Sequence, residues 1–548
     1  MKRFYLFLLI LLLIALFTSV VVLGRDYFLF DLEENTILYM GKDDVAFNKT
    51  IGIDKNPHFL MQTGIPDKYL VIFYPIEDKE NPQNNIPGKL VIYNNATGKS
   101  EDLIELGYSP LKWAYTKDCN QFFITYKSLL SKNYDLLHYN VAETKAEKLP
   151  DFAGSVFDID LSMDESKILA SITDQKYSPQ FLTLSYSPLK VETTLALGRF
   201  PGQIYKFTNE RIALVGVDWR PNIKDKDQQE GTLKLIDIPT NSIIESYKIS
   251  TYGKTYLDWY EKEKVLMVVF GETSCILRFF GGIGVFKITA DNIKYNYIGE
   301  PWANYNYLPE KDSLHILTQN PIKNNWKGDL LILNYSDNSI SKYKTRSNFF
   351  DGNGYFYPYQ FLHIAGTNLE IIFSPKNGNI RIFDINEKSF INEIYEPFVT
   401  FRTLPGQNAV TCNSDRNKFY FIDRRKNKIG VFDSKFERIK DIIVPEKPIE
   451  IYQIEKPAFQ TLITTKKTIY RISSDDILVP IDEFNEGTTE THLYNDDNKV
   501  ILWSEKELFV IDAATLNVTD HFNFYVGPNE KNSKLESGTQ RYYFLRDL

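Results

Sequence analysis

The stretch Leu508-Phe-Val-Ile-Asp512-Ala-Ala-Thr515-Leu-Asn517-Val518 decides the fold. Its first four residues are apolar and suit a pleated, buried strand. Asp512 ends that strand, a short polar segment follows, and Val518 begins a second strand. The stretch therefore predicts a β-hairpin with a tight polar turn.

This hairpin recurs along the chain. Most neighbouring copies are about 45 to 52 residues apart, and the wider gaps contain insertions or a missed copy near Ser185. Self-similarity at this period indicates stacked supersecondary units, and a strand-only unit of this size matches one blade of a β-propeller. The copies turn at Asp31, Asn94, Asn140, Asp237, Asn334, Asp384, Asp433 and Asp512.

A second element precedes each hairpin and consists of two short apolar strands around a polar turn. Examples of the turn are Lys117-Asp-Cys-Asn120 and Asn413-Ser-Asp-Arg-Asn417. Asp and Asn suit it because their side chains bond the neighbouring backbone and tolerate left-handed conformations. Each period then contains four strands, which predicts an all-β chain of four-stranded blades.

These residues resemble the YVTN-type repeats, which are relatives of the WD-repeat and TolB-like β-propellers. Residues 508–518 are similar to the strand-Asp-x-x-Thr-x-x-Val hairpin of that family. Leu106-Gly107 before Pro110 and Leu197-Gly198 before Pro201 resemble its Gly-x-x-Pro crossover between blades. Ser162-Met-Asp164-Glu resembles the Ser-Pro-Asp-Gly turn, with Met163 and Glu165 departing from it. The resemblance implies a propeller fold, which hosts too many roles to imply a function.

The number of blades is left open by the sequence. Ten fairly complete units lie between about residues 57 and 525, and a half unit covers Tyr27 to Met40. Typical rings hold about 4 to 8 blades, so residues 25–548 form either tandem propellers or one elaborated ring. A boundary between tandem propellers would fall near residues 345–360. The C-terminal Tyr542 to Leu545 reads as a strand, and pairing with the N-terminal hairpin would close a ring and remove two sheet edges.

The N-terminus predicts export. Phe4 to Leu23 carries no charge and follows Lys2 and Arg3, so it is long enough to cross a bilayer with the N-terminus in the cytoplasm. Residues 1–24 are therefore a signal anchor or a cleaved signal peptide, and the length of the apolar run favours the anchor. We expect the rest of the chain outside the cytoplasm, membrane-anchored or secreted.

The charge excludes one class of partner. The net charge is −8 and the isoelectric point is near 5.5, whereas proteins that bind a phosphate backbone need a basic footprint. We therefore expect a protein or glycan partner, contact with the membrane through the N-terminal helix, and no nucleic acid.

The predicted connections differ in length, and this difference points to a binding face. Turns inside the hairpins have two to five residues, whereas connections between the second and third strands include residues 75–88, 220–231, 271–282 and 318–329. Insertions in repeat proteins gather on the binding face. Arg beside an aromatic residue is typical of interaction hot spots, although the sequence favours the simpler interpretation that such residues only cap blade ends. The candidate binding residues are Trp219, Arg220, Arg278, Phe279, Trp302, Trp326, Lys327 and Arg402.

Local motifs for catalysis or metal binding are absent from the sequence. Its six histidines are each at least 29 residues from the next, and there is no His-Glu-x-x-His or Gly-x-Ser-x-Gly segment. We predict no metal and no cofactor, and the catalytic residues stay unknown. Propeller enzymes assemble sites from several blades around the central channel, which local motifs do not reveal.

Three functions follow from these observations. The leading hypothesis is an exported, membrane-tethered, non-catalytic binding or scaffold protein that uses the long-loop face. The alternative is an enzyme with a central-channel site, either a glycan-active hydrolase or lyase or a quinone-cofactor oxidoreductase. The third is a structural part of an envelope assembly. A cluster of acids, Arg and His at the inner ends of several blades would favour the enzyme.

Overall fold

The fold is described from a computed structural model of the 548-residue chain. The residues that the structure describes are 27–31, 36–40, 49–52, 57–65, 67–73, 75, 86–94, 96–97, 99–107, 110–128, 131–218, 228–252, 255–271, 282–299, 302–318, 329–344, 360–363, 367–373, 380–394, 409–423, 426–454, 457–485, 487–489, 491–495, 499–504, 507–523 and 542–545.

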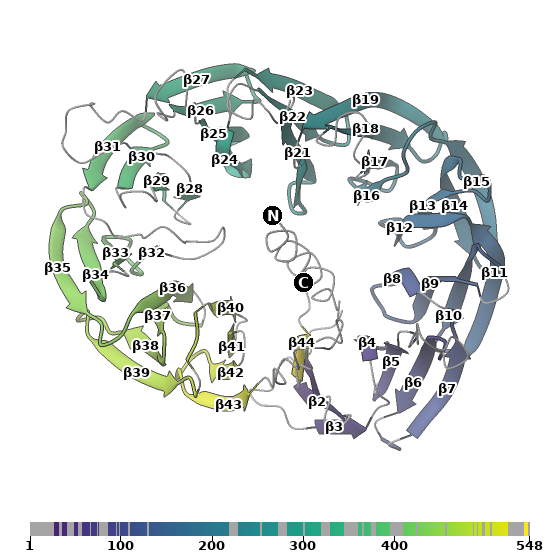
Figure 1. Cartoon of the computed structure of the whole chain (residues 1–548), viewed down its shortest axis with the longest axis horizontal. Helices are drawn as coiled ribbons and strands as arrows, with labels where there is room; N and C mark the ends of the chain where they lie inside the picture. Colours follow the sequence, from purple (N-terminus) through teal and green to yellow (C-terminus); the bar gives the residue numbers. More distant parts are fainter. Residues whose placement is uncertain are drawn as a thin grey trace, which may run out of the picture.

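These residues form eleven four-stranded antiparallel sheets, so the predicted all-β class is confirmed. Figure 1 shows the sheets in chain order around one ring, with one edge strand of each sheet toward the middle and the other at the circumference. This is the arrangement of a β-propeller. The one helix among the described residues is a short 3₁₀ helix, η3 (Pro309–Lys311).

The strands are grouped here by their position in the sheets. The innermost strands are β4 (Pro57–Gln62), β8 (Pro110–Tyr115), β12 (Ser155–Leu161), β16 (Gln203–Lys206), β20 (Thr255–Tyr260), β24 (Trp302–Leu308), β28 (Gln360–His363), β32 (Val410–Cys412), β36 (Pro448–Ile454), β40 (Thr491–Asn495) and β44 (Tyr542–Leu545). The second strands are β1 (Tyr27–Asp31), β5 (Lys68–Phe73), β9 (Gln121–Lys127), β13 (Ile168–Thr173), β17 (Arg211–Asp218), β21 (Val265–Gly271), β25 (Ser313–Thr318), β29 (Leu369–Phe373), β33 (Lys418–Asp423), β37 (Gln460–Thr465) and β41 (Lys499–Ser504).

The outer half of each sheet is a hairpin, and every predicted copy coincides with one except the turn at Asp31, which joins the second and third strands of its sheet. Its first strands are β2 (Thr36–Met40), β6 (Lys89–Asn94), β10 (Tyr134–Asn140), β14 (Pro179–Tyr186), β18 (Gln228–Asp237), β22 (Ile283–Ile288), β26 (Asp329–Asn334), β30 (Ile380–Asp384), β34 (Lys428–Asp433), β38 (Thr468–Ile472) and β42 (Glu507–Asp512). Its second strands, at the circumference, are β3 (Lys49–Gly52), β7 (Lys99–Glu105), β11 (Lys145–Ala153), β15 (Leu189–Ala196), β19 (Ser242–Tyr252), β23 (Ile293–Ile298), β27 (Ser339–Lys344), β31 (Ser389–Ile394), β35 (Arg438–Ile443), β39 (Leu478–Glu483) and β43 (Val518–Asn523).

Acidic and Asn side chains hold the hairpin turns. Asp512 ends β42, and its Oδ1 accepts the backbone N–H of Thr515 at 2.7 Å and the Thr515 hydroxyl at 2.7 Å. Leu516 then takes a left-handed conformation with a φ of 59°. Asp237 at the end of β18 accepts the corresponding two bonds from Thr240. The side chain thus replaces backbone partners that the tight turn cannot supply.

The turns between the first two strands agree with the prediction in one respect and differ in another. The Asn413 side chain accepts the backbone N–H of Asn417 at 3.0 Å, as expected for an Asx-stabilised turn. In these two turns the left-handed residues are Cys119, with a φ of 55°, and Arg416, with a φ of 54°, whereas Asp67 and Asp312 take this conformation in two other turns of the same kind. Asp118 stays outside the left-handed region and instead accepts the N–H of Asn120 at 3.1 Å.

The hydrophobic cores lie between successive sheets. In one of them Phe123 and Leu136 of the β8–β11 sheet pack against Ile168 and Leu182 of the next sheet. The described residues contain nine such cores, running from the β4–β7 sheet to the β40–β43 sheet. Each sheet therefore buries its apolar faces only with the help of its neighbours, as expected for a radial repeat.

The candidate boundary near residues 345–360 lies almost wholly outside the described residues. The sheets before and after it share one core, in which Leu330 and Ile332 pack with Ile372 and Phe383. The same packing of sheet on sheet therefore continues past this part of the chain.

The two ends of the chain meet in one sheet. The strand order is β3-β2-β1-β44, and β44 pairs with β1 from Phe28 opposite Leu545 to Asp31 opposite Tyr542. The half unit at Tyr27 to Met40 is thus completed by β3 and by the last strand of the chain. This is the pairing that the sequence predicted for closing a ring.

Gly107 permits the crossover between two sheets. A Cβ atom on this residue would lie 1.6 Å from the backbone oxygen of Lys127, so no other residue fits without moving the backbone. Gly198, in the corresponding crossover, has a φ of 72°. Glycine is therefore needed at the two predicted crossovers for different reasons. At Gly107 there is no space for a Cβ atom, and at Gly198 the backbone has a positive φ.

The predicted signal anchor or signal peptide at residues 1–24 lies outside the described residues. Within the part of the chain that the structure describes, no helix combines the length and the apolar character needed to cross a bilayer.

Candidate functional site

The predicted binding residues are not brought together by the described structure. Trp302 begins β24 opposite Thr318, but its side chain lies outside the described part of the structure. The other seven also lie outside the described residues, namely Trp219, Arg220, Arg278, Phe279, Trp326, Lys327 and Arg402. No group of His, Cys, Asp or Glu with the geometry of a metal site occurs among the described residues.

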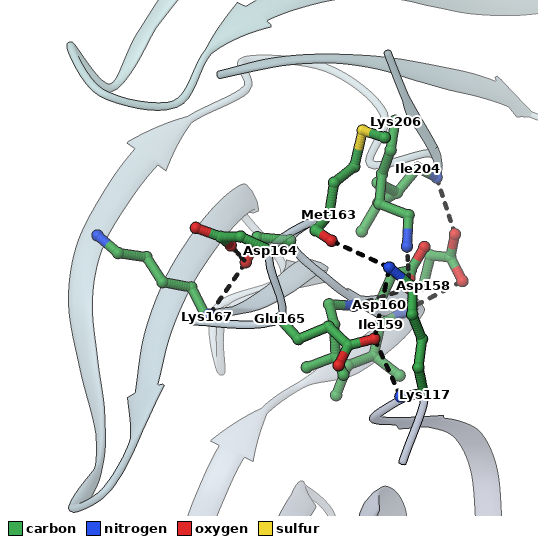
Figure 2. A network of polar contacts seen from close by, with 12 residues as sticks. Lys117, Asp158, Ile159, Asp160, Met163, Asp164, Glu165, Lys167, Ile204 and Lys206 are labelled. Carbon is green, nitrogen blue, oxygen red and sulfur yellow. Dashed lines mark hydrogen bonds and ion pairs between the residues drawn. The ribbon is translucent and has the colours of Figure 1, made fainter. Parts of the chain in front are cut away.

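A different cluster lies on innermost strands of consecutive sheets. Its charged half consists of Lys112 on β8, Asp158 and Asp160 on β12, and Lys206 on β16. Figure 2 shows how the two aspartates point from β12 toward Ile204 and Lys206 of the next sheet. Asp158 and Asp160 share a face because alternate residues of a strand point the same way.

Asp158 connects three sheets. Its Oδ2 accepts the backbone N–H of Ile204 at 2.8 Å, and its Oδ1 lies 3.9 Å from the Lys112 ammonium. Only 17% of the side chain is exposed. Burial raises the pKa of this carboxyl to about 6, since the two contacts compensate only part of the lost hydration and Asp160 adds repulsion. A fraction of Asp158 is therefore protonated near neutral pH.

Asp160 has a different environment. Its Oδ1 accepts from the Lys206 ammonium at 2.7 Å and from the backbone N–H of Leu161 at 2.7 Å. About a third of each partner's side chain remains exposed, with 34% for Asp160 and 29% for Lys206. The ion pair spans two sheets, and exposed pairs of this kind contribute little to stability.

A second ionic contact joins the turns at one end of these strands. Glu165 accepts the backbone N–H of Lys117 at 2.9 Å, and the Lys117 ammonium lies 3.9 Å from the same carboxylate (Figure 2). Lys117 also donates to the Met163 carbonyl at 3.4 Å. These contacts connect the β8–β11 sheet with the β12–β15 sheet, which suits a structural role.

The aromatic half of the cluster continues on the next strands. It consists of Tyr205 on β16, Tyr256 and Asp258 on β20, and Tyr305 on β24. The charges of both Asp158 and Asp258 act on Tyr205, and with burial, the larger cause, they raise the pKa of its hydroxyl. Tyr205 thus links the two halves.

Tyr305 lies against two residues of β20. Its hydroxyl is hydrogen-bonded to Asp258, and burial followed by this bond raises the pKa of the phenol. Its ring meets Tyr256 edge to face, with 6.1 Å between centroids and an interplanar angle of 80°. Tyr256 is 40% exposed, so one aromatic ring of the pair is accessible to solvent.

One further polar contact between sheets is fully buried. Ser313, His315 and Glu370 form a chain of hydrogen bonds that resembles a Ser-His-acid triad, with 3.1 Å from the Ser313 hydroxyl to His315 Nε2 and 2.7 Å from His315 Nδ1 to Glu370 Oε2. At most 1% of any of the three residues is exposed. A substrate has no access to it in this structure, so its role is to pair buried polar groups.

Sequence reasoning missed the inner-strand cluster. Its signal is the alternation Asp158-Ile-Asp160 and Tyr256-Leu-Asp258, in which polar or aromatic residues occupy one face of an edge strand. Neither pattern says which strand of a sheet is innermost, and the members of the cluster come from five sheets.

Comparisons with known proteins add no family. No protein-family model and no curated protein matches the sequence. Among solved structures, hydrazine synthase of Kuenenia stuttgartiensis is 9% identical, with 70% of this chain and 96% of that chain covered and a TM-score of 0.29. The dihydro-heme d1 dehydrogenase NirN is 8% identical over 68% of this chain and 73% of its own, with a TM-score of 0.30.

A third similar structure is a β-propeller domain from Myceliophteria thermophila. It is 12% identical, and the match covers 61% of this chain and 98% of that domain with a TM-score of 0.28. Likeness at this level says nothing of function, and the assignment of the fold rests on the eleven sheets, their order and their shared cores.

Proposed function

We propose that the chain is an extracytoplasmic, membrane-tethered and non-catalytic β-propeller that binds a protein or glycan partner. The observation that carries the proposal is the inner-strand cluster, in which five consecutive sheets contribute side chains and several are partly exposed. Exposed aromatic and charged groups on rigid strands are the means by which repeat proteins hold partners.

Two features of the sequence support the proposed extracytoplasmic localisation and the scaffold role. The uncharged run at residues 4–23 follows two cations, which favours a tether with the ring outside the cytoplasm. The long connections that the sequence predicts follow β5, β17, β21 and β25, and these strands end on the side of the ring where the inner strands begin. We also propose that the repeats are of the YVTN type, on the resemblance of their hairpins and crossovers to that family.

The test uses the full chain in membranes. Protease added from outside the cytoplasm is expected to digest the ring while the chain stays in the membrane fraction. The chain with alanine at Lys112, Asp160 and Lys206 is then compared with the parent for retention of partners from the cell envelope. If the variant and the parent retain partners equally, the charged half has no binding role. If the ring is protected from external protease, the proposed extracytoplasmic localisation is wrong.

A second candidate function is a glycan-active hydrolase or lyase, and one observation favours it. Asp158 has its pKa raised to about 6, whereas Asp160 lies beside the Lys206 ammonium. A carboxyl group whose pKa is raised by burial, with a second carboxyl group close by, can serve as a general acid. Incubation of the full chain with oligosaccharides distinguishes the two functions, because only the enzyme shortens them.

A further inference from the structure

The aromatic half of the cluster contains an exposed ring beside a carboxylate. Tyr256 and Asp258 are alternate residues of β20 and share a face, and 40% of Tyr256 is exposed. The ring of Tyr305 stands edge to face against Tyr256 and holds it at a fixed angle. An aromatic face next to a hydrogen-bond acceptor suits a ligand with one apolar face and a polar edge.

Tyr256 is less buried than other aromatic residues that pack between these sheets. Other aromatic residues on the same strands are interior, such as Tyr307, which is 3% exposed and meets Tyr260 with centroids 4.9 Å apart. On the opposite face of β20, Trp259 packs against Phe207 at 5.3 Å. These pairs fill the space between sheets, whereas a partly exposed ring gains less from burial.

The hydrogen-bonding groups around Tyr256 include both donors and acceptors. Asp258 accepts from the Tyr305 hydroxyl, and the raised pKa of Tyr305 keeps that phenol protonated at neutral pH. Sugar hydroxyls both donate and accept, so a mixed set of this kind matches them.

The charges of the cluster are largely balanced. Asp158 lies 3.9 Å from Lys112, and Asp160 lies 2.7 Å from Lys206. Asp258 is the remaining acid, and the Tyr305 hydroxyl donates to it. An ionic ligand would have to compete with these internal pairs, whereas a neutral ligand would not.

We infer that Tyr256, Asp258 and Tyr305 form a binding site for a neutral saccharide on innermost strands β20 and β24. A pyranose ring stacks on Tyr256, and its hydroxyls bond Asp258 and the Tyr305 phenol. The inference rests on the proposed binding function and names the ligand class and the place.

The experiment is calorimetric titration of the full chain in detergent with three neutral probes, cellohexaose, chitohexaose and maltohexaose. At least one is expected to bind with a dissociation constant below about 1 mM. Tyr256→Ala is expected to weaken that binding at least about tenfold, since a stacking ring supplies most of the affinity. Tyr256→Phe restores it, and Asp258→Asn weakens it about threefold to tenfold because an amide is a poorer acceptor than a carboxylate.

The matched control is Tyr297→Ala. Tyr297 is 51% exposed on outermost strand β23 of the same sheet, so its loss removes an equally accessible ring far from the site. The inference is overturned if none of the three probes binds at about 1 mM, if Tyr256→Ala binds as tightly as the parent, or if choline binds in their place. If the Tyr256→Ala chain still retains partners from the cell envelope, the proposed binding function stands although the saccharide site is wrong. If the oligosaccharide probes are shortened during the titration, the proposal that the protein is non-catalytic is wrong.

Discussion

His315 Nδ1 lies 2.7 Å from Glu370 Oε2 across two successive sheets, and neither side chain is exposed. A buried carboxylate depends on its partner, because removal of one member leaves the other without compensation for lost hydration. We expect His315→Ala to reduce the free energy of unfolding by about 3 to 5 kcal/mol. The measurement is the midpoint of urea unfolding.

The control for that variant is Lys167→Ala, which removes one member of a partly exposed ion pair. Lys167 lies 3.1 Å from Glu192, with 43% and 32% of the two side chains exposed. Exposed pairs contribute at most about 1 kcal/mol. Equal effects of the two substitutions would contradict the importance of burial at His315.

Asp158→Asn is expected to stabilise the protein at neutral pH. The pKa of Asp158 is raised from 3.8 to about 6 in the folded state, so the folded protein binds this proton more tightly than the unfolded chain. Stability associated with the group is therefore complete below pH 4 and decreases as the pH rises to about 6. A shift of about two pH units corresponds to about 3 kcal/mol.

Thermal unfolding between pH 3 and pH 8 tests this prediction. The variant and the parent are expected to differ little at pH 3 and most above pH 6, where the parent has the lower melting temperature. A difference that does not change with pH would show that ionisation of Asp158 is not the cause.

Removal of β44 is expected to open the ring. Truncation after residue 541 takes away the four residues that pair with β1, and leaves the edge of β1 without a partner. We expect a lower melting temperature and a greater tendency to aggregate, measured by calorimetry and by light scattering. Truncation after Leu545, which keeps β44 whole, is the control. Equal melting temperatures for the two truncations would contradict a closing role for this strand.

Gly107→Ala is expected to be far more damaging than Gly198→Ala. The new Cβ would lie 1.6 Å from the Lys127 backbone oxygen in the first case, whereas nothing lies within 4 Å in the second. The φ of 72° at Gly198 alone costs about 1 to 2 kcal/mol for a residue with a Cβ. Chemical unfolding of both variants checks the order, which would be wrong if Gly198→Ala were the less stable.

The fold could be predicted because its signals are local and repeated. The hairpin that turns at Asp512 is defined by one strand, an Asp whose side chain bonds the turn, and a second strand. All three lie within about a dozen residues. The identity of the left-handed residue was harder, since Arg416 takes the conformation expected of a neighbouring Asp or Asn. There the whole turn fixes the backbone, and the propensity of one residue is overridden.

The site was beyond prediction for a physical reason. Asp158, Tyr205 and Asp258 come from three successive repeats, and only the packing of whole sheets brings their charges into range. Hydrophobic alternation tells that a strand has two faces, but it does not tell which strand of a sheet lies nearest the middle. The insertions that drew attention to Arg220 and Trp326 lie outside the described residues.

The pairing of β1 with β44 also has a temporal consequence. Synthesis delivers the first strand of that sheet long before its last, so β1 has no β44 to pair with until the whole chain has been made. During this interval the backbone edge of β1 is accessible to chaperones. A chain whose translation stops early lacks β44 and cannot complete this sheet.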